Sequence, residues 1–117
     1  MAYVDGFVAA VPDVRKQEFI EHAEIIGKVF IEHGAIECVE CWGDEVPEGE
    51  ITSFPRAVQK KDDETIVFSW VLWPDKATRD AGMKKTIDDP RAQPDVAPMP
   101  FDGKRMLIGG FEQIVKS

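Results

Sequence analysis

Residues 66–73, IVFSWVLW, constrain the fold of this chain more than any other stretch. Ser69 is the only polar residue in the run. β-Branched and aromatic side chains pack well on a pleated surface, so this composition predicts a strand. Alternate side chains of a strand point to opposite faces, and here both faces would be apolar. We therefore expect an inner strand of a sheet that is covered on both sides, with Pro74 ending its pairing.

Periodicity elsewhere in the chain predicts two helices and three more strands. Phe19, Ala23, Ile26 and Phe30 recur at i, i+4, i+7 and i+11, which is the spacing of one helical face. We predict helices near residues 14–33 and 75–87, and further strands over residues 3–11, 36–42 and 105–115. Residues 51–58 are expected to lead towards the strand at residues 66–73.

Capping and turn residues set the expected boundaries. Asp13 and Asp75 are the predicted N-caps of the two helices, and Gly34 is the predicted stop of the first. Gly109-Gly110 inside the last strand indicates a bulge or a close backbone approach. Residues 89–103 hold four prolines, which exclude a regular helix or a central strand. So long a connection is expected to cover a pocket or a neighbouring subunit.

The resulting order is β-α-β-β-α-β, in a single domain over residues 1–117. This α+β order predicts the ferredoxin-like fold, with a four-stranded antiparallel sheet and two helices on one face. Two helices cannot cover both faces of the sheet, although the central strand is apolar on both. A second copy of the sheet is the simplest cover, so we predict a homodimer through the open sheet face. Which face meets the partner stays open.

The charge balance excludes some classes of partner. The chain has 22 acidic and 14 basic residues, for a net charge of −8. Such a field repels phosphate backbones and anionic lipid, so we expect no nucleic-acid binding and no membrane binding. No apolar run approaches the ~20 residues of a membrane span. The N-terminus lacks the basic region of a signal peptide and is expected to form a strand, which favours a cytoplasmic location.

Motifs for metals, cofactors and redox chemistry are weak. Cys38 and Cys41 form a C-x-x-C, but residues three apart on a strand point to opposite faces with Cα atoms roughly 10 Å apart. We predict that both cysteines are buried and reduced. His22 and His33 would lie roughly 16 Å apart on one helix, so they cannot share a metal ion. No G-x-G-x-x-G or P-loop motif is present, and no metal or cofactor is predicted.

Four segments together carry a family resemblance: YVDGFVAAVP, ECWGDEVPEG, FSWVLWPDKATRDAG and MPFDGKRMLIGGFE. In this order, and over nearly the whole chain, they resemble the YbaA-like family of small bacterial proteins of unknown function. The resemblance implies the dimeric α/β-barrel superfamily, which also holds antibiotic-biosynthesis-type monooxygenases and stress-responsive barrel proteins. The family has no assigned activity, so it supplies no catalytic residues.

Three functional hypotheses follow. The first is a small-molecule binding domain or a cofactor-free, monooxygenase-like enzyme, with a pocket between sheet and helices as in related barrels. The second is a non-catalytic dimeric stress or interaction protein. The third is a redox protein that uses Cys38 and Cys41, and it has the least support. An internal cavity would favour the first hypothesis, and a fully packed interior the second.

The predicted ligand site lies near the ends of the first two strands, closed by residues 43–56 and by the proline-rich segment. Asp5 is the only ionisable residue between apolar neighbours in its strand, and such a carboxylate is either paired or functionally perturbed. Trp42 would supply an aromatic wall. Arg56 and Arg105 lie nearest to strand ends, where they suit an anionic ligand or an ion pair with Asp5. The structural alternative is that ion pair alone.

Overall fold

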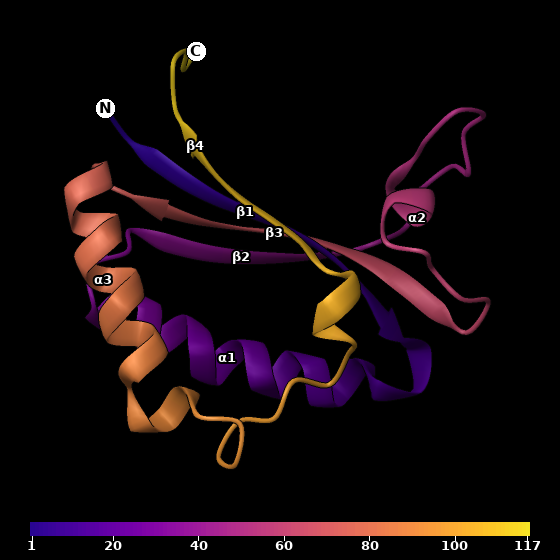
Figure 1. The fold of residues 1–117 in the computed structure, drawn as a ribbon, viewed down its shortest axis with the longest axis horizontal. Coiled ribbons are helices and arrows are strands. Elements are labelled where there is room, and N and C mark those ends of the chain that lie inside the picture. The colour runs from indigo at the N-terminus through magenta and orange to yellow at the C-terminus, as the bar shows by residue number, and fades with distance from the viewer.

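An inner strand, β3 (Glu64–Trp73), lies between two others in a four-stranded antiparallel sheet of order β2-β3-β1-β4. The computed structural model describes residues 1–117 (Figure 1). The other strands are β1 (Tyr3–Pro12), β2 (Glu37–Trp42) and β4 (Leu107–Glu112). The α-helices are α1 (Lys16–Glu32), α2 (Phe54–Ala57) and α3 (Lys76–Asp88), and 3-10 turns occupy Asp13–Arg15, Pro90–Ala92 and Gly103–Arg105. The α+β class and the antiparallel four-stranded sheet are as predicted.

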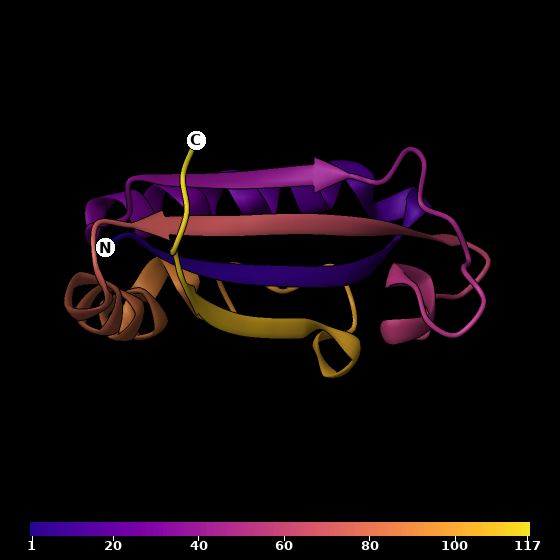
Figure 2. The same ribbon diagram turned by 90° about the horizontal axis from the view of Figure 1, so that it is seen from above.

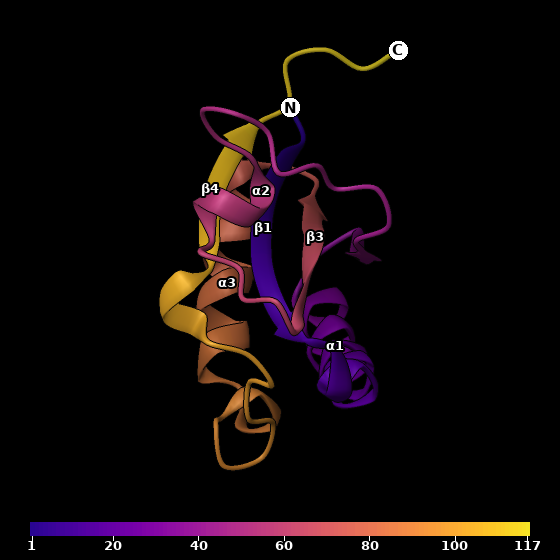
Figure 3. The ribbon, with the colours of Figure 1, turned by 90° about the vertical axis from the view of Figure 1, so that its right-hand side faces the viewer.

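The long helices α1 and α3 cover one face of the sheet. From above, α1 lies behind β2 and β3, α3 lies at one end of the strands, and the open face of the sheet points towards the viewer (Figure 2). In the side view α1 lies under the β3 side and α3 under the β4 side (Figure 3). The third helix, α2, was not predicted. It belongs to the connection between β2 and β3, which packs on one end of the open face: Val46 and Val58 join the cluster formed by Val8, Ala10 and Ile66.

Burial separates the two faces of β3. Val67, Val71 and Trp73 are buried towards the helices, where they pack with side chains such as Phe19 and Phe30. On the open face Phe68 is 45% exposed. The helix face of β3 is therefore covered, as expected, and so is the end of its open face that lies under α2. The middle of the open face is uncovered in the single chain.

The predicted apolar stripe of the first helix lies in α1, but the helix starts differently. A 3-10 turn begins at Asp13, and Arg15 occupies the N-cap of α1 without a side-chain hydrogen bond. Asp13 is therefore not the N-cap, because its carboxylate accepts a hydrogen bond from the Thr65 hydroxyl of β3. The predicted stop is confirmed: Gly34 follows the C-cap with a φ of +112°, a conformation that favours glycine.

Helix α3 follows the prediction closely. Asp75 is its N-cap, and the carboxylate accepts a hydrogen bond of 2.7 Å from the backbone N–H of Thr78. Gly82 allows the close contact between α3 and the sheet, since a Cβ atom there would overlap the Trp73 ring and the His33 carbonyl. The Trp73 indole is completely buried in this contact.

The last strand and the segment before β3 differ from the expectation. Residues 51–58 contain the short helix α2, for which Ser53 is the N-cap. The last strand covers only Leu107–Glu112 and pairs with β1 in unbroken register, so Gly109-Gly110 forms no bulge. Close approach is the reason for glycine here, because a Cβ atom on Gly110 would overlap the Tyr3 hydroxyl. No helix is both long and apolar enough to cross a bilayer.

Candidate functional site

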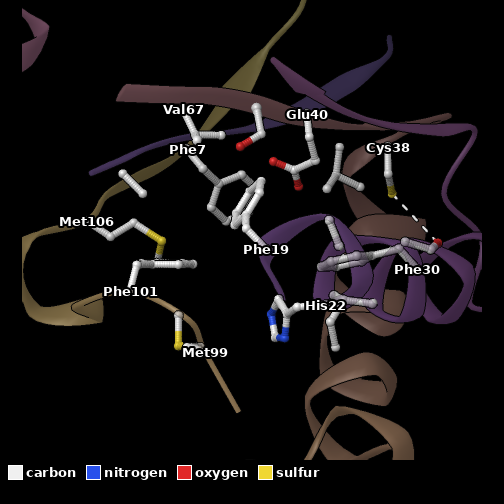
Figure 4. Close-up of a pocket in the computed structure, with 16 residues that line it drawn as sticks. Phe7, Phe19, His22, Phe30, Cys38, Glu40, Val67, Met99, Phe101 and Met106 are labelled. Atoms are coloured by element: carbon white, nitrogen blue, oxygen red, sulfur yellow. Dashed lines mark hydrogen bonds between the residues drawn. The ribbon is translucent and has the colours of Figure 1, made fainter. Parts of the chain in front are cut away.

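A partly open cavity of about 190 Å³ lies between the helix face of the sheet and α1. Twelve of its 16 lining residues are hydrophobic. Its walls are formed largely by aromatic and sulfur-containing side chains: Phe7, Phe19, Phe30, Phe101, Met99 and Met106 (Figure 4). The cavity thus offers an apolar space that few polar groups interrupt.

Helix α1 provides one wall of the cavity through the stripe predicted from sequence. Phe19, Ala23, Ile26 and Phe30 all line it, together with His22 and Gly27. Two small residues of α1 create the space: Ala23 of the stripe and Gly27 beside it. A Cβ atom on Gly27 would lie 3.8 Å from the Cβ of Cys38. Two large side chains at these positions would fill the cavity.

The proline-rich segment closes a second side of the cavity, which is one of the two roles expected for it, whereas residues 43–56, also expected to close the site, contribute no lining residue. Met99 and Phe101 from this segment and Met106 just after it line the cavity. The Phe101 ring packs against Phe19 with a centroid separation of 6.0 Å and an interplanar angle of 58°. Ala97 is buried as well, so this part of the connection is anchored to the core although it has no regular structure.

Glu40 is the only carboxylate in the cavity wall. It lies on the edge strand β2, opposite Ser69 of β3 in the strand register. Its side chain borders the apolar groups of the cavity (Figure 4), and Glu40 is solvent-exposed along the open edge of the sheet. Desolvation by the surrounding protein raises the pKa of Glu40, and a hydrogen bond with the Ser69 hydroxyl partly opposes that shift.

Two further polar side chains line the cavity. The Nδ1 atom of His22 is buried without a hydrogen-bond partner, and burial lowers the pKa of this imidazole. Burial and the nearby carboxylates of Glu40 and Glu37 raise the pKa of the Cys38 thiol to about 12. Both side chains are therefore held in their neutral forms near pH 7. The chain contains no cluster of three or more His, Cys, Asp or Glu side chains placed to hold a metal ion.

The cysteines occupy opposite faces of β2, as predicted. Cys38 faces the helices and Cys41 the open face, and both are free thiols. The prediction that both are buried is wrong for Cys41, which is exposed because the open face has no cover at that point, and Cys38 is only half-buried. The histidines are also separate, since His33 pairs through Nε2 with Asp89 at 3.0 Å.

Asp5 is completely buried, but its partner is not one of the predicted arginines. Its carboxylate accepts hydrogen bonds from Arg79 of α3, with Nη2 at 2.8 Å, and from the Trp73 indole at 2.9 Å. The expected pairing with Arg56 or Arg105 is thus corrected, because the path of α3 across the sheet places Arg79 nearer. The Asp5–Arg79 contact is thus a structural ion pair of the kind given above as the alternative to a ligand site, with a different arginine.

The other three predicted residues have partners other than Asp5. Arg105 forms an ion pair with Glu64, with Nη2 2.6 Å from Oε2, and donates to the Gln59 carbonyl at 2.9 Å. Arg56 donates to the Glu48 carbonyl at 2.9 Å within its own connection. Trp42 packs against Phe19, with ring centroids 6.4 Å apart. None of the four predicted residues lines the cavity.

Glu40, Ser69 and His22 were not selected from sequence as ligand-contacting residues. One signal was available: Glu40 alternates with Cys38 and Trp42, so strand periodicity places this acid on an otherwise apolar face. Such a position is unusual for a carboxylate unless it is paired or functional.

Comparison with known proteins identifies relatives over nearly the whole chain. The protein is 48% identical over 115 residues to "Uncharacterized protein YbaA" of Escherichia coli (strain K12), covering 98% of each chain. The same identity and coverage relate it to "Uncharacterized protein YbaA" of Shigella flexneri. A family model described as "Protein of unknown function (DUF1428)" matches residues 2–103, which include the cavity walls except Met106. The chain therefore belongs to the DUF1428 family, whose function is unknown.

Proposed function

We propose that this protein binds a small, largely apolar molecule in the cavity between the sheet and α1, and that it does so as a homodimer. The observation that carries the proposal is the placement of Glu40 beside Ser69 in an otherwise apolar wall. Ligand sites are typically apolar spaces with a few polar groups that fix orientation.

A simple packing defect would have a different lining. Protein interiors are close-packed, and empty cavities that persist are usually lined by apolar groups alone. Here an acid, a hydroxyl and the unpartnered His22 Nδ1 face or border one space. Leaving the buried His22 Nδ1 atom without a partner is costly in an apolar environment, so a ligand that satisfies it would be favoured.

The open sheet face supports the homodimer. A groove of about 570 Å³ on this face is lined by apolar residues, among them Phe68, Trp70, Leu107 and Phe111. Phe111 is 61% exposed and Leu107 43% exposed in the single chain. Burial of a large apolar side chain contributes about 1.5–3 kcal/mol, so pairing of two such faces is a strong source of association energy. Contiguous exposed apolar surface of this kind is typical of an interface.

We extend the proposal to the architecture of the assembly. The order β2-β3-β1-β4, with α1 and α3 on one face, supports a ferredoxin-like chain. Two such sheets packed through their open faces would form a dimeric α/β barrel. Each cavity would then lie on the outer, helix-covered side of its own sheet, so ligand binding and dimerisation would use different surfaces.

The proposed function is tested by filling the cavity. Ala23→Leu adds a branched side chain at the middle of the α1 wall, and the matched control Ala81→Leu makes the same change on exposed surface of α3. Binding of monocyclic aromatic probes is measured by calorimetry and by the shift in Tm. We expect the wild type and Ala81→Leu to bind at least one probe and Ala23→Leu to bind none. Failure of the wild type to bind, or equal binding by both variants, would contradict the proposal.

A further inference from the structure

We propose that the ligand of this cavity is an uncharged, single-ring aromatic molecule with a hydroxyl group that donates a hydrogen bond to Glu40. This assignment rests on the proposed function and adds the chemical class of the ligand. Three properties of the cavity carry it: its size and lining, the absence of a cationic partner, and the position of its single carboxylate.

The size and lining favour one aromatic ring. An apolar cavity of about 150 Å³ holds benzene, so 190 Å³ admits a ring with one or two small substituents. Phe7, Phe19 and Phe101 offer ring faces and edges, and aromatic pairs gain energy beyond area burial in offset or edge-to-face arrangements. Met99 and Met106 add thioether sulfurs, which make favourable contacts with ring edges.

The charges exclude an anionic ligand. No lysine or arginine lines the cavity, and burial lowers the pKa of His22, the only basic side chain in its wall. A carboxylate or phosphate would therefore enter without a cationic partner and beside Glu40, which is unfavourable both by desolvation and by like charge. A neutral ligand avoids both costs.

The position of Glu40 indicates the polar group of the ligand. Its carboxylate interacts with the hydroxyl of Ser69, a residue that is only 7% exposed. A carboxylate has about four acceptor sites, so one hydroxyl leaves it with free acceptor capacity. A ligand hydroxyl at the Glu40 end of the cavity would donate to that carboxylate while its ring lies among the phenylalanines.

The test compares four probes that share one ring: phenol, toluene, benzoate and benzylamine. At pH 7 phenol is uncharged, because a phenolic hydroxyl titrates near pH 10. Calorimetry on the 117-residue protein should show phenol binding about tenfold more tightly than toluene, as expected for one hydrogen bond to a carboxylate. Benzoate should not bind, because its charge would be desolvated beside Glu40 without a cationic partner. Benzylamine should bind more weakly than phenol, because moving its ammonium group from water into a largely apolar cavity is costly.

The Glu40→Leu variant separates this inference from the proposed function. It should lose the preference for phenol and retain toluene binding, which also shows that the cavity is intact. Glu24→Leu, on the exposed side of α1, should keep the wild-type preference. Any one of three results would overturn this inference and leave the proposed function standing. They are equal affinities for phenol and toluene in the wild type, binding of benzoate or benzylamine that is tighter than that of phenol, and an unchanged phenol preference in Glu40→Leu. If none of the four probes binds the wild type, both this inference and the proposed function are wrong.

Discussion

Arg79 of α3 reaches across to the sheet and holds the completely buried carboxylate of Asp5 in β1, with Nη2 2.8 Å from Oδ1. Its Nε atom lies 3.1 Å from both oxygens of the same carboxylate. The Tyr3 ring stacks below the guanidinium, with its centroid 5.0 Å from Cζ. This contact joins β1 to α3, two elements that are far apart in the chain.

We predict that Asp5→Asn destabilises the fold. The change removes the charge that compensates Arg79, and loss of one partner of a buried pair costs about 3–5 kcal/mol. Because Arg79 is partly exposed, solvent screening should reduce this cost, and we expect a loss of about 2–3 kcal/mol in the free energy of unfolding measured with urea. Asp95→Asn, an exposed control, should change it by less than about 0.5 kcal/mol. A similarly small loss for Asp5→Asn would show that the carboxylate is not structural.

The ion pair of Glu64 with Arg105 predicts a specific dependence of stability on pH. Hydrogen bonds from Arg105 lower the pKa of Glu64 below its ordinary value of 4.5. A carboxyl with a lowered pKa in the folded state adds stability above the unfolded pKa, and this stability is lost as the pH falls through the folded pKa. Glu64→Gln should therefore be clearly less stable than the wild type at pH 7.

The difference between Glu64→Gln and the wild type should narrow when urea unfolding is repeated at pH 3, below the unfolded pKa of this carboxyl. Asp44→Asn, which changes an exposed acid in the connection after β2, should show no comparable narrowing. A Glu64→Gln difference that stays the same at both pH values would contradict the assignment of this ion pair.

The homodimer prediction concerns the open sheet face. A dimer of the 13.1 kDa chain would have a mass of about 26 kDa by light scattering. Phe68→Asp places a charge in the middle of the open face, where burial in an interface would be costly, so this variant should be a monomer at micromolar concentration. Ile25→Asp, which changes a side chain of α1 that is 40% exposed, should remain dimeric. A wild-type mass near that of one chain would contradict the proposed assembly.

The thiol of Cys38 should react slowly while the protein is folded. Its pKa of about 12 leaves very little thiolate near pH 8, and thiolate is the reactive form. In the Cys41→Ser variant, which leaves one cysteine, we expect reaction with a disulfide reagent at least about tenfold slower in the native protein than in urea. Equal rates in the two conditions would show that the Cys38 thiol is neither shielded nor perturbed.

The secondary structure was predictable wherever one periodicity dominates. The apolar run of β3 and the four-residue stripe of α1 each indicated one structure, and Asp75 was recognisable as a cap because a helix directly follows it. Asp13 was misleading, since its carboxylate bonds to Thr65 of another strand. Local patterns cannot distinguish a cap from a tertiary contact made by the same side chain.

The site was less predictable because it depends on which elements meet. Strand alternation alone places Glu40 on the same face as Cys38 and Trp42, but the space beside it exists only because Ala23 and Gly27 of α1 lie opposite. The partner of Asp5 likewise depends on the path of α3. For the proline-rich segment the sequence left two roles open, the cover of a pocket or of a neighbouring subunit, because its contacts depend on the path of the chain after α3.

The most direct test of ligand binding in this cavity is a crystal structure of the wild-type protein grown with saturating phenol. The account predicts electron density for one ring among Phe7, Phe19 and Phe101, with its hydroxyl oxygen at about 2.5–3.0 Å from a Glu40 carboxylate oxygen. The contradicting result is a cavity without ligand density, or phenol bound only in the groove of the open sheet face.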